Sequence, residues 1–239
     1  MSGKIFSCKE ALAFGWREFW VRPWFWLGIL LVFGAILLLN ILADRIMPKG
    51  SVAQGMIVAG LFMLLNQFLM AGWIRICLNI HDHQPFTFRT LFSSFTDGCR
   101  IFLTALYLAV GLVLPAFVTY TMFRLFFDGN RMVMNTVMVL LFVAGTYVMA
   151  RVLFYALLIV DRGMGAAAAL NTCFEMTRGH VRTVYCFWLL TILVQMLGAL
   201  SLLLGLVVTI PLVLLAKVFV YRKLSAQHYS AVVPSEEGV

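Results

Sequence analysis

The chain has 239 residues, of which 63% are hydrophobic and 12% are charged, and its mean hydropathy is +0.98. Soluble domains carry roughly 45–50% apolar and about 25% charged residues, so this composition excludes a soluble globular protein and indicates an integral membrane protein. The formal net charge is +8, but no basic block with interleaved aromatic residues is present, so we expect no nucleic-acid partner.

The chain opens with a segment that favours an interfacial helix. Residues 7–10 match the S-x-x-E capping box, which predicts a helix beginning at Ser7. Arg22 and Pro23 predict its end. We expect its apolar side to lie in the headgroup boundary. That side carries Leu12, Gly15, Trp16 and Phe19.

Two apolar runs follow and predict the first membrane hairpin. Residues 24–43 contain no charge, and twenty helical residues cover the roughly 30 Å hydrocarbon core. Residues 52–78 form the second predicted span, which carries Asn66 and Gln67 in its middle.

A second interfacial helix is predicted at residues 88–95, with Leu91 and Phe95 on its apolar side. The third span covers 101–123, and Pro115 should kink it. The next apolar run, 132–160, would be about 43 Å long as one helix, which is too long for an upright crossing. We place the fourth span at 132–150, with Arg151 reaching the headgroups; a tilted span to 160 with Arg151 buried is the alternative.

Residues 161–182 form the third interfacial stretch, in which Leu170 and Phe174 lie on one helical side. We expect Asp161 to pair with Arg178 or His180 at the helix ends. The uncharged run 184–216 is long enough for two crossings, predicted at 183–197 and 206–220 with a tight turn between Gly198 and Gly205. Residues 1–229 form one membrane domain, and 230–239 read as a disordered tail.

Basic residues favour one orientation. With a cytoplasmic N-terminus, 14 Lys and Arg residues fall inside and 4 outside, so both termini should be cytoplasmic. The predicted outer loops contain no cysteine, so no disulfide is expected.

The three interfacial stretches predict an internal repeat. Each carries a leucine followed by an aromatic residue four positions later, and each precedes a helical hairpin. The expected fold is therefore all-α: a six-helix membrane bundle of three repeats around a pseudo-threefold centre. The anchor pairs are Leu12/Trp16, Leu91/Phe95 and Leu170/Phe174.

The stretch from Asp161 to Arg182 resembles a group of bacterial multi-pass membrane proteins of unknown function. These are similar to the membrane domain of glycerophosphoryl diester phosphodiesterases. Residues 208–211 (VTIP) and 220–222 (VYR) add to the likeness, as do residues 174–180 (FEMTRGH). The resemblance implies a six-helix bundle in a bacterial cytoplasmic membrane and no agreed activity, and the chain lacks a polar segment large enough for the phosphodiesterase domain.

Candidate chemical groups are few. His81, Asp82 and His83 could bind a metal, but they lack helical spacing and a further ligand, so a wet surface loop is favoured. We expect no metal site, no cofactor and no enzymatic activity, because no nucleophile and base are spaced for catalysis. All ten acidic residues lie outside the centres of the spans, which disfavours cation-coupled transport.

Arg151 is the strongest candidate ligand contact, because an ionisable residue in an apolar run is costly. It could hold an anionic lipid or phosphate, with Asn66, Gln67 and Gln195 lining a polar path, or it could snorkel to the surface. Two functions follow. The first is a non-enzymatic membrane scaffold that organises lipid or a membrane or cytoplasmic protein; the second is a small transporter or flippase for an anionic or lipid-like substrate.

Overall fold

A computed structural model describes residues 7–46, 52–126, 131–201 and 204–232. The described chain is all-α, and six of its helices are long and apolar enough to cross a membrane, which confirms the predicted fold class. The elements are α1 (Cys8–Val21), α2 (Pro23–Ile46), α3 (Val52–His81), the 3-10 helix η1 (Phe88–Phe92), α4 (Phe95–Phe126), α5 (Arg131–Arg151), α6 (Tyr155–Arg162), α7 (Ala166–Met176), α8 (Val181–Leu200) and α9 (Leu204–Val232).

The repeat order has three units, each an interfacial element followed by a hairpin: α1 with α2 and α3, η1 with α4 and with α5 continued by α6, and α7 with α8 and α9. The middle element corrects one expectation, because the amphipathic helix predicted through Phe95 is a single 3-10 turn, and Phe95 opens α4. Thr87 and Thr90 cap this turn at one end, and the Ser93 hydroxyl donates to the Thr90 carbonyl at the other. These short-range bonds compete with longer helix formation.

Helix α1 begins after Ser7 as expected, but the Ser7 side chain makes no capping hydrogen bond, so the predicted capping box is wrong. The buried stripe is Ala11, Gly15 and Phe19, whereas Trp16 is exposed. The apolar side is therefore rotated from the expected one. Small residues face the protein because a neighbouring helix lies very close.

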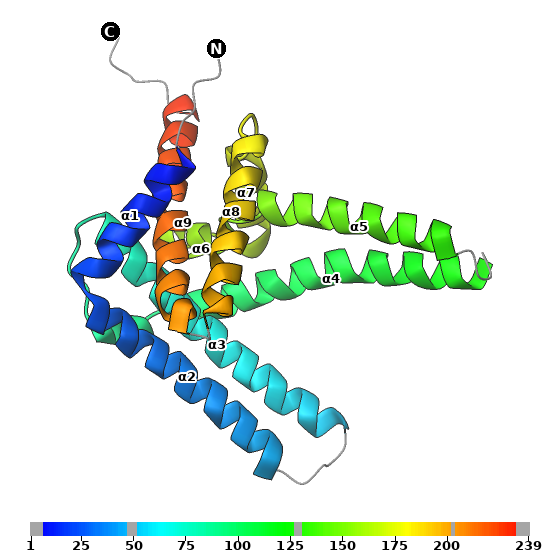
Figure 1. Cartoon of the computed structure of the whole chain (residues 1–239), viewed down its shortest axis with the longest axis horizontal. Helices are drawn as coiled ribbons and strands as arrows, with labels where there is room; N and C mark the ends of the chain where they lie inside the picture. The colour runs from blue at the N-terminus through cyan, green and yellow to red at the C-terminus, as the bar shows by residue number, and fades with distance from the viewer. Residues whose placement is uncertain (1–6, 47–51, 127–130, 202–203, 233–239) are drawn as a thin grey trace.

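That neighbour is α9, which runs beside α1 (Figure 1). A Cβ added at Gly15 would lie 2.5 Å from the Leu212 carbonyl oxygen. The same close approach occurs between η1 and α3, where a Cβ at Gly72 would collide with the Leu91 backbone. The interfacial helix of the third unit, α7, packs against α6.

These three contacts form a closed cycle. The interfacial element of each unit packs on the second half of the preceding unit's hairpin, and α1 of the first unit closes the cycle on α9 of the last. The protein core lies where these elements meet, and it contains the inner end of α3, most of α6 and the middle of α9. This is the arrangement expected of three repeats around a common centre.

The sequence spacing agrees with this cycle. The leucine of each anchor pair lies 79 residues after the previous one, and so does its aromatic partner. The small residues beside them keep the same spacing, and all of them except Thr90 are buried. These positions are Ala11, Thr90 and Ala169, and then Gly15, Ser94 and Cys173.

Away from the core, the first two hairpins diverge as two arms, α2 with α3 and α4 with α5 (Figure 1). Their outer halves expose many large apolar side chains, as lipid-facing helices do. Pro115 lies inside α4 without ending it.

The later segments differ in detail from the predicted boundaries. Helix α5 ends at Arg151, and three turn residues separate it from α6. Gly198 belongs to α8 and packs against Gly205 of α9, so these glycines serve helix contact. Helix α9 reaches Val232, three residues into the predicted tail; residues 233–239 lie outside the described part.

Candidate functional site

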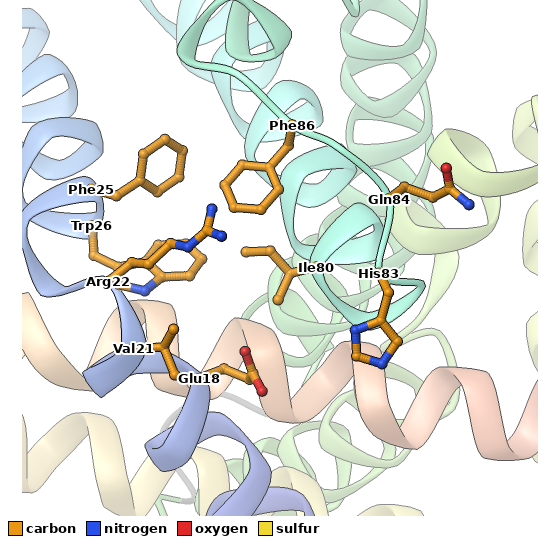
Figure 2. A pocket seen from close by; sticks show the side chains of 9 residues that line it. All are labelled: Glu18, Val21, Arg22, Phe25, Trp26, Ile80, His83, Gln84 and Phe86. Atoms are coloured by element: carbon orange, nitrogen blue, oxygen red, sulfur yellow. The ribbon is translucent and has the colours of Figure 1, made fainter.

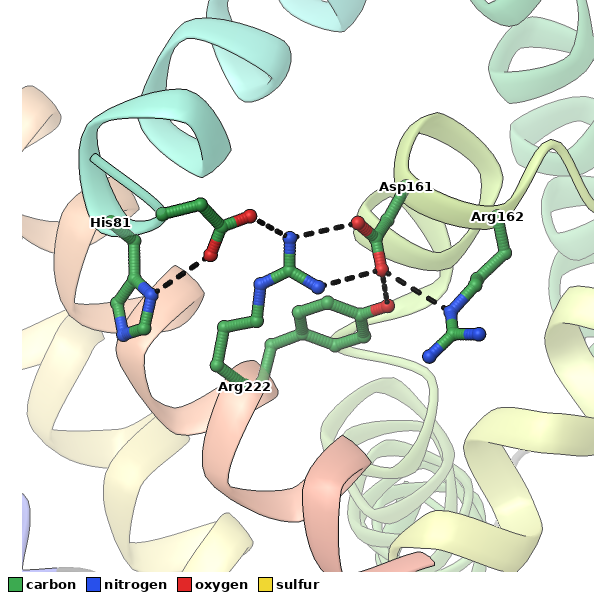
Figure 3. Close-up of polar contacts among 6 residues, drawn as sticks. His81, Asp161, Arg162 and Arg222 are labelled. Carbon is green, nitrogen blue, oxygen red and sulfur yellow. Dashed lines mark hydrogen bonds and ion pairs between the residues drawn. The ribbon is translucent and has the colours of Figure 1, made fainter. Parts of the chain in front are cut away.

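The three units meet in an ion cluster that we define as Asp82, Asp161 and Arg222 (Figure 3). Asp82 follows α3, Asp161 lies near the end of α6, and Arg222 lies in α9. Each residue therefore comes from the second half of a different hairpin, and Asp82 and Asp161 lie at its end. Asp82 and Asp161 are also 79 residues apart, so they occupy equivalent positions in their repeats.

Arg222 bridges the two carboxylates. Its Nη1 donates to Oδ2 of Asp161 at 3.0 Å, and its Nη2 lies 2.9 Å from Oδ1, which is a bidentate pair. The same Nη2 donates to Oδ2 of Asp82. Because the guanidinium fork matches carboxylate geometry, arginine holds such a position better than lysine. The cluster thus joins all three units through one side chain.

Further groups complete the hydrogen bonding of the two carboxylates. The Tyr221 hydroxyl donates to Oδ2 of Asp161 at 2.6 Å, and Nε of Arg162 lies 3.5 Å from the same oxygen. Nδ1 of His81 lies 3.2 Å from Oδ1 of Asp82. With two aspartates and two arginines, the formal charges balance.

The cluster is partly shielded from solvent. The side chains of Asp161, Arg222 and Asp82 are 12%, 23% and 36% exposed. Partial burial strengthens the ion pairs and makes the loss of one partner costly. Among the described residues no group of three or more His, Cys, Asp or Glu could hold a metal, and both carboxylates are already bonded. The arrangement is suited to holding helices together.

Other polar bonds connect the same side of the molecule. Lys223 lies 3.3 Å from Glu10, which joins the end of α9 to the start of α1. Nη1 of Arg100 donates to the carbonyl of Gly163 at 2.7 Å, and Arg75 pairs with Asp97 at 2.9 Å. These bonds reinforce the contacts between units.

Arg151 lies at the end of α5, where its guanidinium bonds to the protein. Its Nε donates to the Thr177 hydroxyl at 2.8 Å, its Nη2 to the Phe174 carbonyl at 2.5 Å, and its Nη1 to the Tyr147 hydroxyl at 3.1 Å. The guanidinium also lies 4.8 Å from the centre of the Phe174 ring. Arg151 therefore secures the end of α7 to α5.

The polar residues proposed beside Arg151 lie on other helices. Asn66 lines a shallow hollow between α2 and α3 together with Asn40, Gln67 lies beside it on α3, and Gln195 is exposed on α8. Within the described segments no hydrogen bond connects any of them to Arg151. An anion path through these residues stays a prediction.

The anchor pairs divide into two kinds of side chain. Leu91 and Leu170 are buried and Leu12 is half-buried, so the leucines pack inward. Trp16 and Phe95 are exposed, and the Phe174 ring lies under Arg151. The aromatic residues therefore meet lipid or an arginine, as interfacial aromatics do.

Cys173 of α7 occupies the small-residue position of its unit and is fully buried. Burial raises the pKa of its thiol to about 12, while a hydrogen bond with the backbone of Phe154 lowers the pKa in part. The group therefore remains a protonated thiol near neutral pH and packs as a small apolar side chain.

The ion cluster was not anticipated from the sequence, where Asp161 was expected to pair with Arg178 or His180. That expectation is wrong, because Asp161 bonds to Arg162, Tyr221 and Arg222. The repeat spacing is the signal that places Asp82 and Asp161 at matching helix ends. Only the closed cycle of helices brings Arg222 to them.

Comparisons with protein-family models, with curated proteins and with solved structures found no match. The fold and the ion cluster therefore define the class on their own: a multi-pass helical membrane protein built from three units joined at one ionic junction.

Proposed function

We propose that the protein is a non-enzymatic membrane scaffold that holds lipid and a partner membrane protein between its two arms. The observation that carries this proposal is the contrast between a tightly joined centre and diverging arms. Three units are locked together by the helix cycle and by Arg222. The arms α2/α3 and α4/α5 then leave apolar helix surface that the chain itself does not cover (Figure 1).

Helices in lipid associate through close packing, and a helix pair that diverges leaves space for lipid or for other helices. The inner border of this space is formed by α3 and α4, which meet at the core and separate outward. Exposed Ile57 and Leu61 lie on α3, and exposed Val113 and Phe117 lie on α4. Because the centre is rigid, the two arms can hold lipid or a partner helix at a fixed position between them.

The test is photo-crosslinking in the native membrane. A benzoylphenylalanine residue at Ile57 or at Val113 should give a protein adduct of the same mass from either arm. Leu200, exposed at the end of α8 outside both arms, is the control position and should not give that adduct. Adducts with lipid alone at both arm positions would contradict the partner-holding function.

The transporter alternative rests on Arg151 as a substrate contact. The three hydrogen bonds of Arg151 to the protein support a structural role instead. We place the protein in a bacterial cytoplasmic membrane with both termini inside, on the basis of the basic-residue distribution and the stated family resemblance.

A further inference from the structure

A pocket of about 230 Å³ lies between α1, the start of α2 and the loop after α3 (Figure 2). This volume is far above the ~15 Å³ that admits a single water. Helix α2 begins its span at Pro23 and α3 ends its span at His81, so the pocket lies where two crossings reach the same membrane surface. The residues that line it are Glu18, Val21, Arg22, Phe25, Trp26, Ile80, His83, Gln84 and Phe86.

Aromatic residues beside the pocket place it at headgroup level. Trp20 and Trp24, on the helices that flank Arg22, are exposed, Trp24 by 82%. Tryptophan is enriched at membrane–water interfaces, where its ring is apolar and its N–H meets water or headgroups. The pocket therefore faces the zone where phospholipid headgroups lie.

Among the residues that the structure describes, three polar groups of the pocket have no hydrogen-bond or ion-pair partner. Trp26 is only 1% exposed, yet its indole N–H has no hydrogen-bond acceptor in the described structure. Within the same described residues, neither the Glu18 carboxylate nor the Arg22 guanidinium has an ion-pair partner; the guanidinium lies 4.8 Å from the Phe86 ring centre. A buried N–H without an acceptor costs free energy, so a ligand that accepts from it is favoured.

The loop that closes the pocket is held in an uncommon conformation. His83 has a φ of 53°, in the left-handed region that non-glycine residues rarely adopt. Its backbone N–H donates to Ile80, and the Gln84 N–H donates to Asn79, which fixes the turn. His83, Gln84 and Phe86 of this loop lie in the pocket wall, and uncommon backbone conformations of this kind cluster at ligand sites.

We propose that this pocket binds the headgroup of a phospholipid that carries a phosphate and a primary ammonium, such as phosphatidylethanolamine. The phosphate would accept from Arg22 and from the Trp26 indole N–H, and the ammonium would donate to Glu18. An acidic headgroup without an ammonium would meet the Glu18 carboxylate unfavourably. A quaternary ammonium has no N–H to donate to it. The site is independent of the scaffold function proposed above.

Native mass spectrometry of the detergent-solubilised protein tests the site with short-chain phosphatidylethanolamine, phosphatidylcholine and phosphatidylglycerol. Phosphatidylethanolamine should bind at least tenfold more tightly than the other two, since a hydrogen bond to a charged group contributes about one to two factors of ten. Soluble phosphoethanolamine should compete weakly, because the acyl chains add apolar burial. Equal binding of all three lipids, preference for phosphatidylglycerol, or full competition by phosphoethanolamine would overturn the lipid site.

Three variants locate the binding. Glu18→Gln and Arg22→Gln should each weaken phosphatidylethanolamine binding roughly tenfold. Glu10→Gln and Arg17→Gln on α1 are the matched charge controls and should leave it unchanged, because neither residue lines the pocket. Trp26→Phe removes the indole N–H, together with part of the ring volume, and should also weaken binding.

Trp73 provides the control for Trp26. It is buried and its indole N–H also lacks an acceptor in the described structure, but it lies outside the pocket. Trp73→Phe should therefore leave lipid binding intact. Equal loss with Trp26→Phe and Trp73→Phe, or no loss with Trp26→Phe in a protein of unchanged thermal stability, would contradict the proposal.

Discussion

At the scale of single residues, Arg222 carries more of the architecture than any other charged side chain described here. It joins two carboxylates from two other repeats, and its formal charge balances theirs together with Arg162. Removing it would leave Asp82 and Asp161 partly buried without their shared cation. Such a loss costs several kcal/mol when the pair is fully buried, and less where solvent reaches it.

Arg222→Met should therefore lower the free energy of unfolding by about 2 kcal/mol and the melting temperature by several degrees. Thermal unfolding in detergent measures the change. Arg178→Met, at an exposed position, is the matched control and should change little. The triple variant Arg222→Met, Asp82→Asn, Asp161→Asn should recover part of the loss, because neither carboxylate is then left charged without Arg222, although Arg162 loses its partner. An equal loss in Arg222→Met and Arg178→Met would show that the cluster is not structural.

The sequence alone does not predict that the three residues of this cluster meet. Asp82 was interpreted as part of a wet loop and Asp161 as a helix-end residue, each from its neighbours in the chain. Arg222 lies 140 residues after Asp82, so only the three-dimensional cycle of helices brings them together. A local sequence pattern does not predict such a contact. The 79-residue repeat spacing predicts only that Asp82 and Asp161 occupy equivalent positions.

At the scale of elements, the long helices could be predicted because few backbone conformations are stable in hydrocarbon. Long apolar runs of sufficient length must be helices, since unpaired backbone groups are too costly in hydrocarbon. The short elements were less predictable. The turn at η1 is set by Thr87, Thr90 and Ser93, and the orientation of α1 is set by its fit to α9.

Gly15 makes that fit possible, so Gly15→Ala should push α1 away from α9. We expect a loss of about 1–3 kcal/mol, typical of overpacking, in spite of alanine's better helix propensity. Gly34→Ala in α2 is the control, because a Cβ there meets nothing within 4 Å, and it should be neutral or slightly stabilising. Thermal unfolding and protease sensitivity near Arg22 measure the effect. Equal stability of the two variants would refute close packing at Gly15.

At the scale of the whole molecule, the six candidate spans predict that the start of α1 and the end of α9 lie on one side of the membrane. The ion pair between Glu10 and Lys223 agrees with this placement. The basic residues predict that this side is cytoplasmic. The positions expected outside are the loops around residues 47–51, 127–130 and 202–203, which lie beyond the described segments.

Reporter fusions test this orientation. A fluorescent protein at the C-terminus should be fluorescent, and alkaline phosphatase inserted at residues 47–51 or 127–130 should be active, because phosphatase folds only outside the cytoplasm. Phosphatase fused at the C-terminus is the control and should be inactive. The opposite pattern would show that both termini lie outside the cytoplasm, and it would still agree with six crossings.

The closure of α1 onto α9 also sets an order of assembly. The surface of α1 that carries Ala11, Gly15 and Phe19 packs against α9, a helix that is synthesised much later than α1. During synthesis α1 is therefore without this partner until α9 has been made, and contacts of such long sequence separation form slowly. Insertion of the three hairpins can proceed one after another, but the centre described here is complete only when α9 arrives.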